Sequence, residues 1–211
     1  MKFLKLPILF LVSFAQAHNL VDIAKLNSDV ILDIKYATRN NFTGEIIYSK
    51  AKCFLVAEVA NALNNAAKDF AELGYKLKVW DGYTPQAMQF KLWNAVRRKF
   101  GNPEKYAAEP IKGCTHNCGV AVDLTLVDKN GNELNMGSEF DDFSEKSCRD
   151  CKDTCEEIKK NRKLLEDTMM KHKFSNNSKW WWHFEYNDAV KNPEKYPLLD
   201  ESFEELEEKQ K

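Results

Sequence analysis

Apolar residues recur at steps of three and four along residues 56–73, which is the spacing of one buried face of an α-helix. Gly74 follows this segment and acts as a helix stop. A second helix is predicted after Pro85, because Met88, Leu92, Val96 and Phe100 lie at four-residue steps. Between the two helices, residues 75–81 alternate in polarity, which predicts a strand.

The most regular alternation begins at Gly119 and continues to residue 127. One face of this predicted strand is apolar, and Asp123 lies on the opposite face. A carboxylate in such a strand is costly to bury unless a positive charge holds it. After the strand, Asn130-Gly131 is a strong signal for a hairpin.

Three further elements complete the pattern. Residues 30–36 alternate as a strand, residues 156–173 carry apolar side chains at helical spacing, and a last aromatic strand holds Trp180, Trp181, Trp182 and His183. There is no internal repeat and no linker. The mixed order of strands and helices predicts a single α+β domain, with a mainly antiparallel sheet and helices packed on one side.

Residues 1–17 have the composition of a secretory signal peptide. Lys2 and Lys5 precede a short apolar run, and Ala15-Gln16-Ala17 supplies small residues before a cut near Ala17. The run is too short to span a bilayer. We therefore expect an exported protein, periplasmic or secreted, with a domain at residues 18–200 and a charged C-terminal tail at residues 201–211.

The charge and hydropathy of the mature chain limit the classes of partner that it is expected to bind. The formal charge of −1 becomes −3 once Lys2 and Lys5 are removed. Proteins that bind nucleic acid usually present a basic face, so no nucleic-acid partner is expected. No segment after residue 17 approaches the length of a membrane span. Nothing in the pattern indicates the oligomeric state.

Six cysteines in an exported chain suggest disulfides. They are Cys53, Cys114, Cys118, Cys148, Cys151 and Cys155. The sequence does not choose among the pairings, and our expectation joins the 114/118 pair to the 148–155 cluster. The alternative is a zinc cluster of four of these thiolates, which an oxidising compartment disfavours.

Candidate chemistry lies at the strand with the buried carboxylate. His116 and Asp123 stand on either side of Gly119, and His183 lies in the last predicted strand. Two histidines and one aspartate commonly hold zinc with the fourth position open to water, as in a catalytic site. Each histidine alone could equally be a core residue, so spacing leaves both interpretations open.

The motifs together resemble the D-alanyl-D-alanine dipeptidases, zinc enzymes of the vancomycin-resistance type in the wider D,D-carboxypeptidase superfamily. The matching pieces follow in the same order along almost the whole mature chain. They are Leu32-Asp33-Ile34-Lys35-Tyr36-Ala37-Thr38, Asn41-Phe42-Thr43-Gly44, Trp80-Asp81-Gly82-Tyr83, His116-Asn117, Gly119-Val120-Ala121-Val122-Asp123-Leu124-Thr125-Leu126, Met136-Gly137, Phe140-Asp141-Asp142-Phe143, Asn161-Arg162, Leu164-Leu165 and Trp181-Trp182-His183-Phe184.

This resemblance implies that His116, Asp123 and His183 hold one Zn²⁺ per chain and that D-Ala-D-Ala, a building block of peptidoglycan, is hydrolysed. In the family, a glutamate three residues before the last histidine takes a proton from water. An arginine in an Asp-x-Tyr-Arg-Pro turn stabilises the oxyanion. Asp142 matches a position that can hold the substrate ammonium, with a loop-capping carboxylate as the alternative.

Two departures from the family pattern fall on the chemistry itself. Trp180 occupies the glutamate position and Thr84 the arginine position. An indole has no basic site, and threonine carries no charge. Glu185 lies two residues beyond His183 and is therefore a candidate replacement base on the same strand face, or else a structural residue. In addition, cysteines at positions 114 and 118 replace the serine and basic residue that are usual in the family.

Two functions follow from these residues. The first is a zinc dipeptidase that hydrolyses D-Ala-D-Ala-type dipeptides in cell-wall metabolism with reduced activity. The second is a catalytically silent zinc-binding protein. In both, the expected partner is a small dipeptide or cell-wall fragment.

Overall fold

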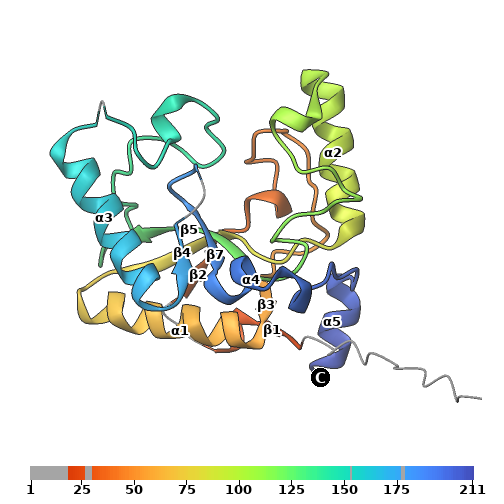
Figure 1. Cartoon of the computed structure of the whole chain (residues 1–211), viewed down its shortest axis with the longest axis horizontal. Coiled ribbons are helices and arrows are strands. Elements are labelled where there is room, and N and C mark those ends of the chain that lie inside the picture. Colours follow the sequence, from red (N-terminus) through yellow and green to blue (C-terminus); the bar gives the residue numbers. More distant parts are fainter. Residues whose placement is uncertain (1–18, 27–29, 153, 177–178) are drawn as a thin grey trace, which may run out of the picture.

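A five-stranded sheet forms the centre of the molecule (Figure 1). Its strands, in spatial order, are β2 (Val30–Leu32), β4 (Lys76–Asp81), β5 (Ala121–Val127), β7 (His183–Tyr186) and β6 (Phe174–Ser175). The β2–β4 pairing is parallel and the other three pairings of this sheet are antiparallel. The computed structural model describes residues 19–26, 30–152, 154–176 and 179–211, so the predicted signal peptide lies outside the described residues.

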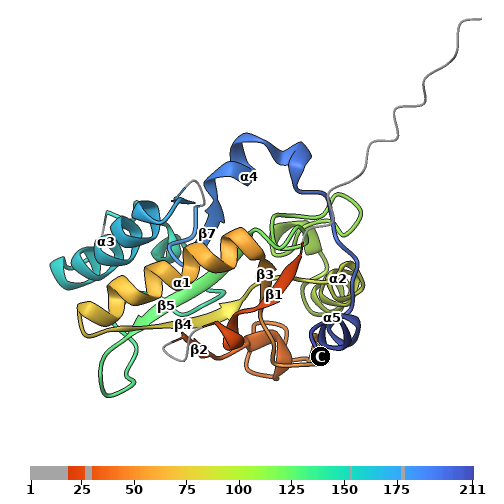
Figure 2. The same ribbon diagram turned by 90° about the horizontal axis from the view of Figure 1, so that it is seen from below.

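The combination of this sheet with helices confirms the predicted α+β class, although the helices do not all lie on one face of the sheet. The helices are α1 (Ala57–Glu72), α2 (Gln86–Phe100), α3 (Glu156–Lys171), α4 (Asn187–Lys191) and α5 (Phe203–Lys209). Helix α1 runs across the lower face of the sheet, with α3 beside it (Figure 2). Val59, Leu63 and Phe70 of the predicted apolar stripe are buried in α1, whereas Leu73 at the end of that stripe is exposed. Helix α2 and long loops lie on the other side of the sheet, above it in Figure 1.

A second, two-stranded sheet pairs β1 (Leu20–Asp22) with β3 (Phe54–Val56) and supports the entry to β5. The backbone N–H of Val56 donates to the carbonyl of Gly119 at 2.9 Å. Gly119 has a φ of +69°, and a Cβ at this position would lie 2.7 Å from Leu20 Cδ2. Only glycine therefore allows both the turn and the close packing.

The last predicted strand starts later than the sequence pattern suggests. Strand β7 begins at His183, whereas Trp181 and Trp182 form a turn and Trp180 makes only an isolated bridge to Cys148. The backbone N–H of Trp181 donates to the carbonyl of Ser147 instead of joining the central ladder. Aromatic character suggested a strand here, but packing against the loop before α3 bends the chain.

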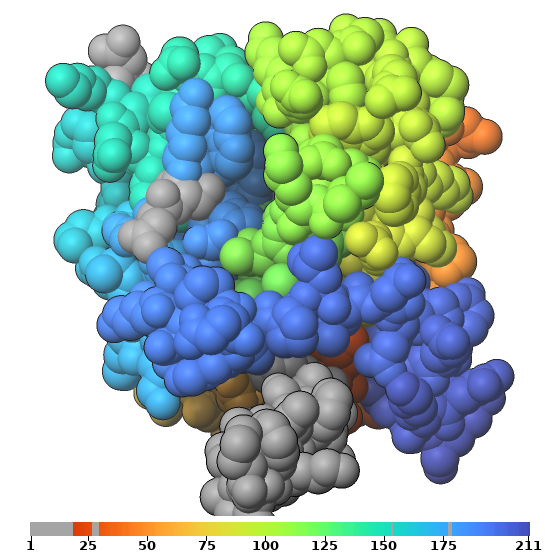
Figure 3. Space-filling view, turned by 45° about the vertical axis from the view of Figure 1, so that its right-hand side comes forward, coloured from red at the N-terminus to blue at the C-terminus, as the bar shows by residue number. Residues whose placement is uncertain are grey.

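The segment expected as a charged C-terminal tail, residues 201–211, contains a helix that packs on the rest of the protein. Ser202 and Glu205 form a reciprocal capping box at the start of α5. Phe203 and Leu206 are buried, and Phe203 stacks on Phe54 at 5.9 Å. Figure 3 shows this dark blue segment lying against the body of the molecule. Because most residues of this segment are charged, the sequence pattern did not indicate that Phe203 and Leu206 would be buried.

All six cysteines are free thiols in the structure, so the expected link between the 114/118 pair and the 148–155 cluster is not formed. Each group is held within its own loop. The thiol of Cys114 donates to Asn117 Oδ1 at 3.3 Å, and that of Cys148 donates to Glu145 Oε2 at 3.7 Å. Among the described helices, none is long and apolar enough to cross a membrane.

Candidate metal centre

Strand pairing brings two of the three predicted ligands together. Asp123 in β5 lies directly opposite His183 in β7, so their side chains lie next to each other on the same face of the sheet. His116 comes from the loop before β5. The tight turn at Gly119, whose N–H donates to the carbonyl of His116 at 3.0 Å, folds this loop back over the strand.

The three ligating atoms form a compact triangle. His183 Nδ1 lies 2.8 Å from Asp123 Oδ1, His116 Nε2 lies 3.2 Å from His183 Nδ1, and His116 Nε2 lies 3.4 Å from Asp123 Oδ1. A tetrahedral zinc ion with bonds of 2.0–2.1 Å requires ligand atoms about 3.3 Å apart. The donor types and their spacing therefore fit zinc, and no other His, Cys, Asp or Glu group in the described residues does so.

Outer hydrogen bonds set which nitrogen of each imidazole faces the centre. His116 Nδ1 lies 2.7 Å from the carbonyl oxygen of Gly82, which leaves Nε2 for the metal. His183 Nε2 lies 3.5 Å from Glu185 Oε1, which leaves Nδ1 for the metal. Such partners fix the orientation of ligating histidines.

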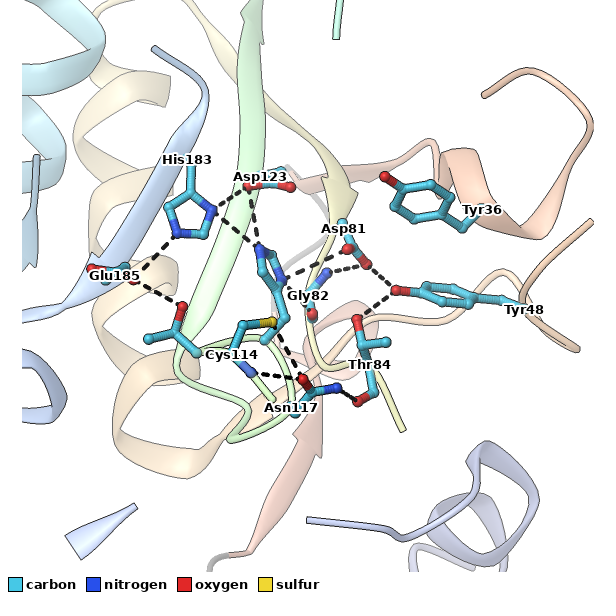
Figure 4. A network of polar contacts seen from close by, with 12 residues as sticks. Tyr36, Tyr48, Asp81, Gly82, Thr84, Cys114, Asn117, Asp123, His183 and Glu185 are labelled. Atoms are coloured by element: carbon cyan, nitrogen blue, oxygen red, sulfur yellow. Dashed lines mark hydrogen bonds and ion pairs between the residues drawn. The ribbon is translucent and has the colours of Figure 1, made fainter. Parts of the chain in front are cut away.

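Glu185 is placed behind His183, away from the ligating atoms (Figure 4). Its carboxylate also accepts a hydrogen bond from the hydroxyl of Thr115 at 2.9 Å. The structure thus gives Glu185 an orienting role toward His183. A base for metal-bound water would have to approach from the opposite side of this imidazole.

The electrostatics of the triangle favour positive charge. Burial alone lowers the pKa of His116, but the nearby carboxylates of Asp123 and Asp81 raise it well above its ordinary value. Burial likewise opposes the ionised form of Asp123, yet the two imidazoles hold its pKa below the ordinary value. A buried carboxylate between two imidazoles is stabilised by a cation, whether protons or a metal.

Thr84, for which the resemblance implies an arginine position, lies in a buried network of hydroxyl groups. Thr84 is 2% exposed, and its hydroxyl lies 2.6 Å from that of Tyr48. The Tyr48 hydroxyl also donates to Asp81 Oδ1 at 2.8 Å. Burial of Asp81 raises the pKa of its carboxyl to about 6. The network contains no cation that could stabilise an oxyanion.

Trp180, for which the resemblance implies a glutamate position, is a stacked indole. The ring of Trp180 lies parallel to that of Trp182, with centroids 5.7 Å apart, and meets the edge of Phe143 at 5.8 Å. Phe143 in turn packs against Phe42 and Tyr106. Trp180 therefore belongs to a cluster of aromatic rings with Trp182, Phe143, Phe42 and Tyr106, and this cluster connects different loops of the protein.

The loop after β5 holds two neighbouring aspartates, Asp141 and Asp142, that lie in different environments. Asp142 Oδ1 caps the N–H of Ser144 at 2.9 Å, which matches the loop-capping alternative. Asp141, at a φ of +59°, accepts a hydrogen bond from the Tyr36 hydroxyl at 2.9 Å. Burial raises the pKa of Asp141 well above its ordinary value, and the charges of Asp123 and Asp81 add to this effect. Asp141 is thus the aspartate near the centre.

Arg149 is a positioning residue that the sequence pattern did not indicate. Its guanidinium donates at 2.9 Å to the carbonyls of Trp180 and His183, and it lies over the ring of Phe184. These contacts hold the turn that delivers His183 to the centre. No motif marked this arginine, which lies in a loop of mixed charge.

Comparison with known proteins shows the family to which this chain belongs. Residues 16–205 match the family model described as D-ala-D-ala dipeptidase. The D-alanyl-D-alanine dipeptidase of Escherichia coli K12 is 36% identical over 184 residues, covering 87% of this chain and 91% of its own. That of Enterococcus faecalis is 36% identical over 172 residues, covering 74% of this chain and 85% of its own.

A solved structure is also similar. The LD-carboxypeptidase LdcB aligns with a TM-score of 0.47 at 20% identity, covering 90% of this chain and 80% of the other.

Proposed function

Because the chain belongs to the D-ala-D-ala dipeptidase family of zinc metallopeptidases, we propose that it binds zinc and a D-Ala-D-Ala-type dipeptide or cell-wall fragment but hydrolyses the peptide far more slowly than its relatives. One observation carries this proposal. The triangle of His116, Asp123 and His183 is complete, while Trp180 and Thr84 are both committed to other contacts.

The metal would be held by the two imidazoles and the Asp123 carboxylate. When bound, zinc polarises a peptide carbonyl and lowers the pKa of coordinated water. Gly82 and Glu185 keep the imidazoles oriented for that role. At the position where the resemblance places the general base, Trp180 has no basic atom that could accept the proton.

Asp141 supports recognition of a free amino end. It is half-buried, so a ligand can reach it, and it lies close to two other carboxylates, Asp81 and Asp123. A ligand ammonium beside Asp141 would relieve this like-charge repulsion. A short peptide with a free amine, bound across Asp141 and the metal, fits this distribution of charge.

The expected loss of rate follows from the two substitutions. Loss of a general base lowers rates by about 10²–10⁴-fold. Loss of an oxyanion donor lowers them by about 10²–10³-fold. The two effects are seldom additive, so we expect wild-type turnover at least about 10³-fold below that of a complete site.

Export belongs to the same proposal. The charged start, apolar run and Ala15-Gln16-Ala17 of residues 1–17 support cleavage near Ala17 and action in the cell-wall compartment.

The test compares zinc-loaded protein lacking residues 1–17 with the double variant Trp180→Glu/Thr84→Arg. Release of D-alanine from D-Ala-D-Ala is followed, and binding of the dipeptide is measured by calorimetry. We expect saturable binding by the wild type, little turnover, and a rise in turnover in the double variant. His183→Ala is the matched control, and it should abolish binding and turnover.

Two results would contradict the proposal. Wild-type turnover equal to that of the double variant would mean that the site is a full enzyme with a different base. If the zinc-loaded wild type did not bind the dipeptide, the proposed ligand would be wrong.

A further inference from the structure

A turn with a cysteine at each end lies against the segment that leads to His183. The backbone N–H of Cys151 donates to the carbonyl of Cys148 at 3.1 Å, which closes a tight turn around Arg149 and Asp150. The Cα atoms at the two ends of such a turn lie less than about 7 Å apart. A disulfide joins Cα atoms that are about 4.4–6.8 Å apart. A bond between the two sulfur atoms therefore requires little movement of the backbone.

The two thiols are available for this bond. Both cysteines are free and half-buried, so a small reagent can reach them. Both thiols also interact electrostatically with the same guanidinium, that of Arg162 in α3. The Cys148 thiol donates to Glu145 Oε2 at 3.7 Å, and a thiol is a weak donor, so its rotation toward Cys151 costs little.

The turn holds the backbone before His183 through its main chain and through one side chain. The backbone N–H of Arg149 donates to the carbonyl of Lys179 at 2.7 Å. The guanidinium of Arg149 donates at 2.9 Å to the carbonyls of Trp180 and His183. Cys148 also forms an isolated β-bridge with Trp180. The position of the turn therefore fixes the chain where it enters β7.

The two ends of the turn are held unequally. At one end, the carbonyl of Cys148 accepts a hydrogen bond from Arg162 Nη1 at 2.7 Å, in addition to the bridge with Trp180. At the other end, the carbonyl of Cys151 accepts a longer hydrogen bond, at 3.3 Å, from the hydroxyl of Thr154. A covalent bond between the cysteines would tie the weaker end to the firmer one.

We propose that Cys148 and Cys151 are a site of reversible oxidation, at which a small-molecule disulfide converts the two thiols into an internal disulfide that holds Arg149 and the segment before His183 in place. With oxidised glutathione, one cysteine attacks as its thiolate, forms a mixed disulfide and releases one glutathione thiolate. The second cysteine then attacks the mixed disulfide and releases the other glutathione. The cysteine pair loses two electrons and two protons, and two reduced glutathione molecules take them up.

The test equilibrates the protein lacking residues 1–17 with mixtures of reduced and oxidised glutathione. Free thiols are then alkylated and located by peptide mass mapping. We expect Cys148 and Cys151 to lose their alkylation together, as one internal disulfide that excess reduced glutathione reopens. Cys151→Ser should leave Cys148 as a mixed disulfide with glutathione. Cys155→Ser is the matched control, and it should leave the pair unchanged.

Amide hydrogen exchange measures the effect on the segment before β7. The backbone N–H of Trp181 donates to the carbonyl of Ser147 at 3.2 Å, so its exchange reports whether this segment opens. We expect oxidation to slow exchange of the Trp181 amide at least about threefold. The same change should occur in Cys155→Ser and be absent in Cys148→Ser/Cys151→Ser. The amide of Leu206 in α5 should not respond.

Three outcomes would overturn the proposal. Alkylation of both thiols at every glutathione ratio would show that the pair is not oxidised. A bond between Cys151 and Cys155 would show that the turn is not the site. Equal exchange of the Trp181 amide in oxidised and reduced protein would show that the disulfide does not hold this segment. Neither measurement uses zinc or a peptide, so these outcomes are independent of the proposed function.

Discussion

The hydroxyl oxygens of Thr84 and Tyr48 lie 2.6 Å apart in the interior of the protein. Both residues are buried, and the same Tyr48 hydroxyl reaches Asp81. The Thr84 hydroxyl is therefore one member of a buried network that links it through Tyr48 to Asp81.

This network should be measurable as a coupling energy between Thr84 and Tyr48. Thr84→Val and Tyr48→Phe each remove one hydroxyl, and each should lower the free energy of unfolding by about 1–3 kcal/mol because a buried partner is left unsatisfied. The double variant should lose less than the sum of the two. Urea unfolding at pH 7 measures all three. Strict additivity would show that the two hydroxyls do not interact.

Glu185 should act on metal affinity through His183. Glu185→Ala removes the group that orients the imidazole, and we expect about 10–100-fold weaker zinc binding in a competition assay with a chelator. Glu185→Gln keeps an acceptor for His183 and Thr115, so its effect should be smaller. Glu194→Ala, near the chain surface, is the control. Zinc affinity equal to wild type in Glu185→Ala, with loss of turnover, would instead identify a base.

Asp69 should stabilise the packing of α1 against α3 in a pH-dependent way. Its carboxylate lies 2.6 Å from Lys171 Nζ and 2.7 Å from His172 Nε2, and these contacts hold the pKa of Asp69 below its ordinary value. A lowered native pKa means that the stabilisation is complete above the ordinary carboxyl pKa and is lost as pH falls through the lowered one. Asp69→Asn should therefore cost about 0.5–1 kcal/mol at pH 7.

The difference between wild type and Asp69→Asn should shrink toward pH 3, measured by chemical unfolding at both pH values. Asp167→Asn, which breaks an exposed pair with Lys163, is the control and should change stability less. A constant difference across the pH range would exclude the ion pair as its cause.

Much of the fold was predictable because apolar residues recur at regular spacing along its helices and strands. The buried face of α1 and the alternation in the first four residues of β4 are confirmed by the structure. The prediction that β5 buries only one face is wrong, because all seven of its residues, Asp123 included, are buried. The ligand triangle followed from residue types and family resemblance, and strand pairing supplies its geometry. These features depend on local pattern or on motifs that survive in the sequence.

The remaining features depend on tertiary contacts that leave no local pattern. Choosing Asp141 over Asp142 requires the Tyr36 hydroxyl, which is 105 positions away in the chain. Arg149 becomes a positioning residue only because the turn before β7 folds over it. The anchors of α5 are two apolar residues among acidic neighbours, so composition concealed them.

Gly119 provides a final test, because it joins the metal loop to β5. Gly119→Ala places a Cβ at positive φ and 2.7 Å from Leu20 Cδ2, so both backbone strain and a steric clash are introduced. We expect a loss of about 1–3 kcal/mol in the free energy of unfolding. Zinc stoichiometry should also fall, since His116 depends on this turn.

Gly131→Ala is the matched control for this substitution. Gly131 also has a positive φ, of +85°, but nothing lies within 4 Å of a Cβ built there. It should show the backbone strain alone, with a smaller loss of stability and unchanged zinc content by elemental analysis. Equal effects of the two substitutions on zinc content would mean that the turn at Gly119 does not position His116.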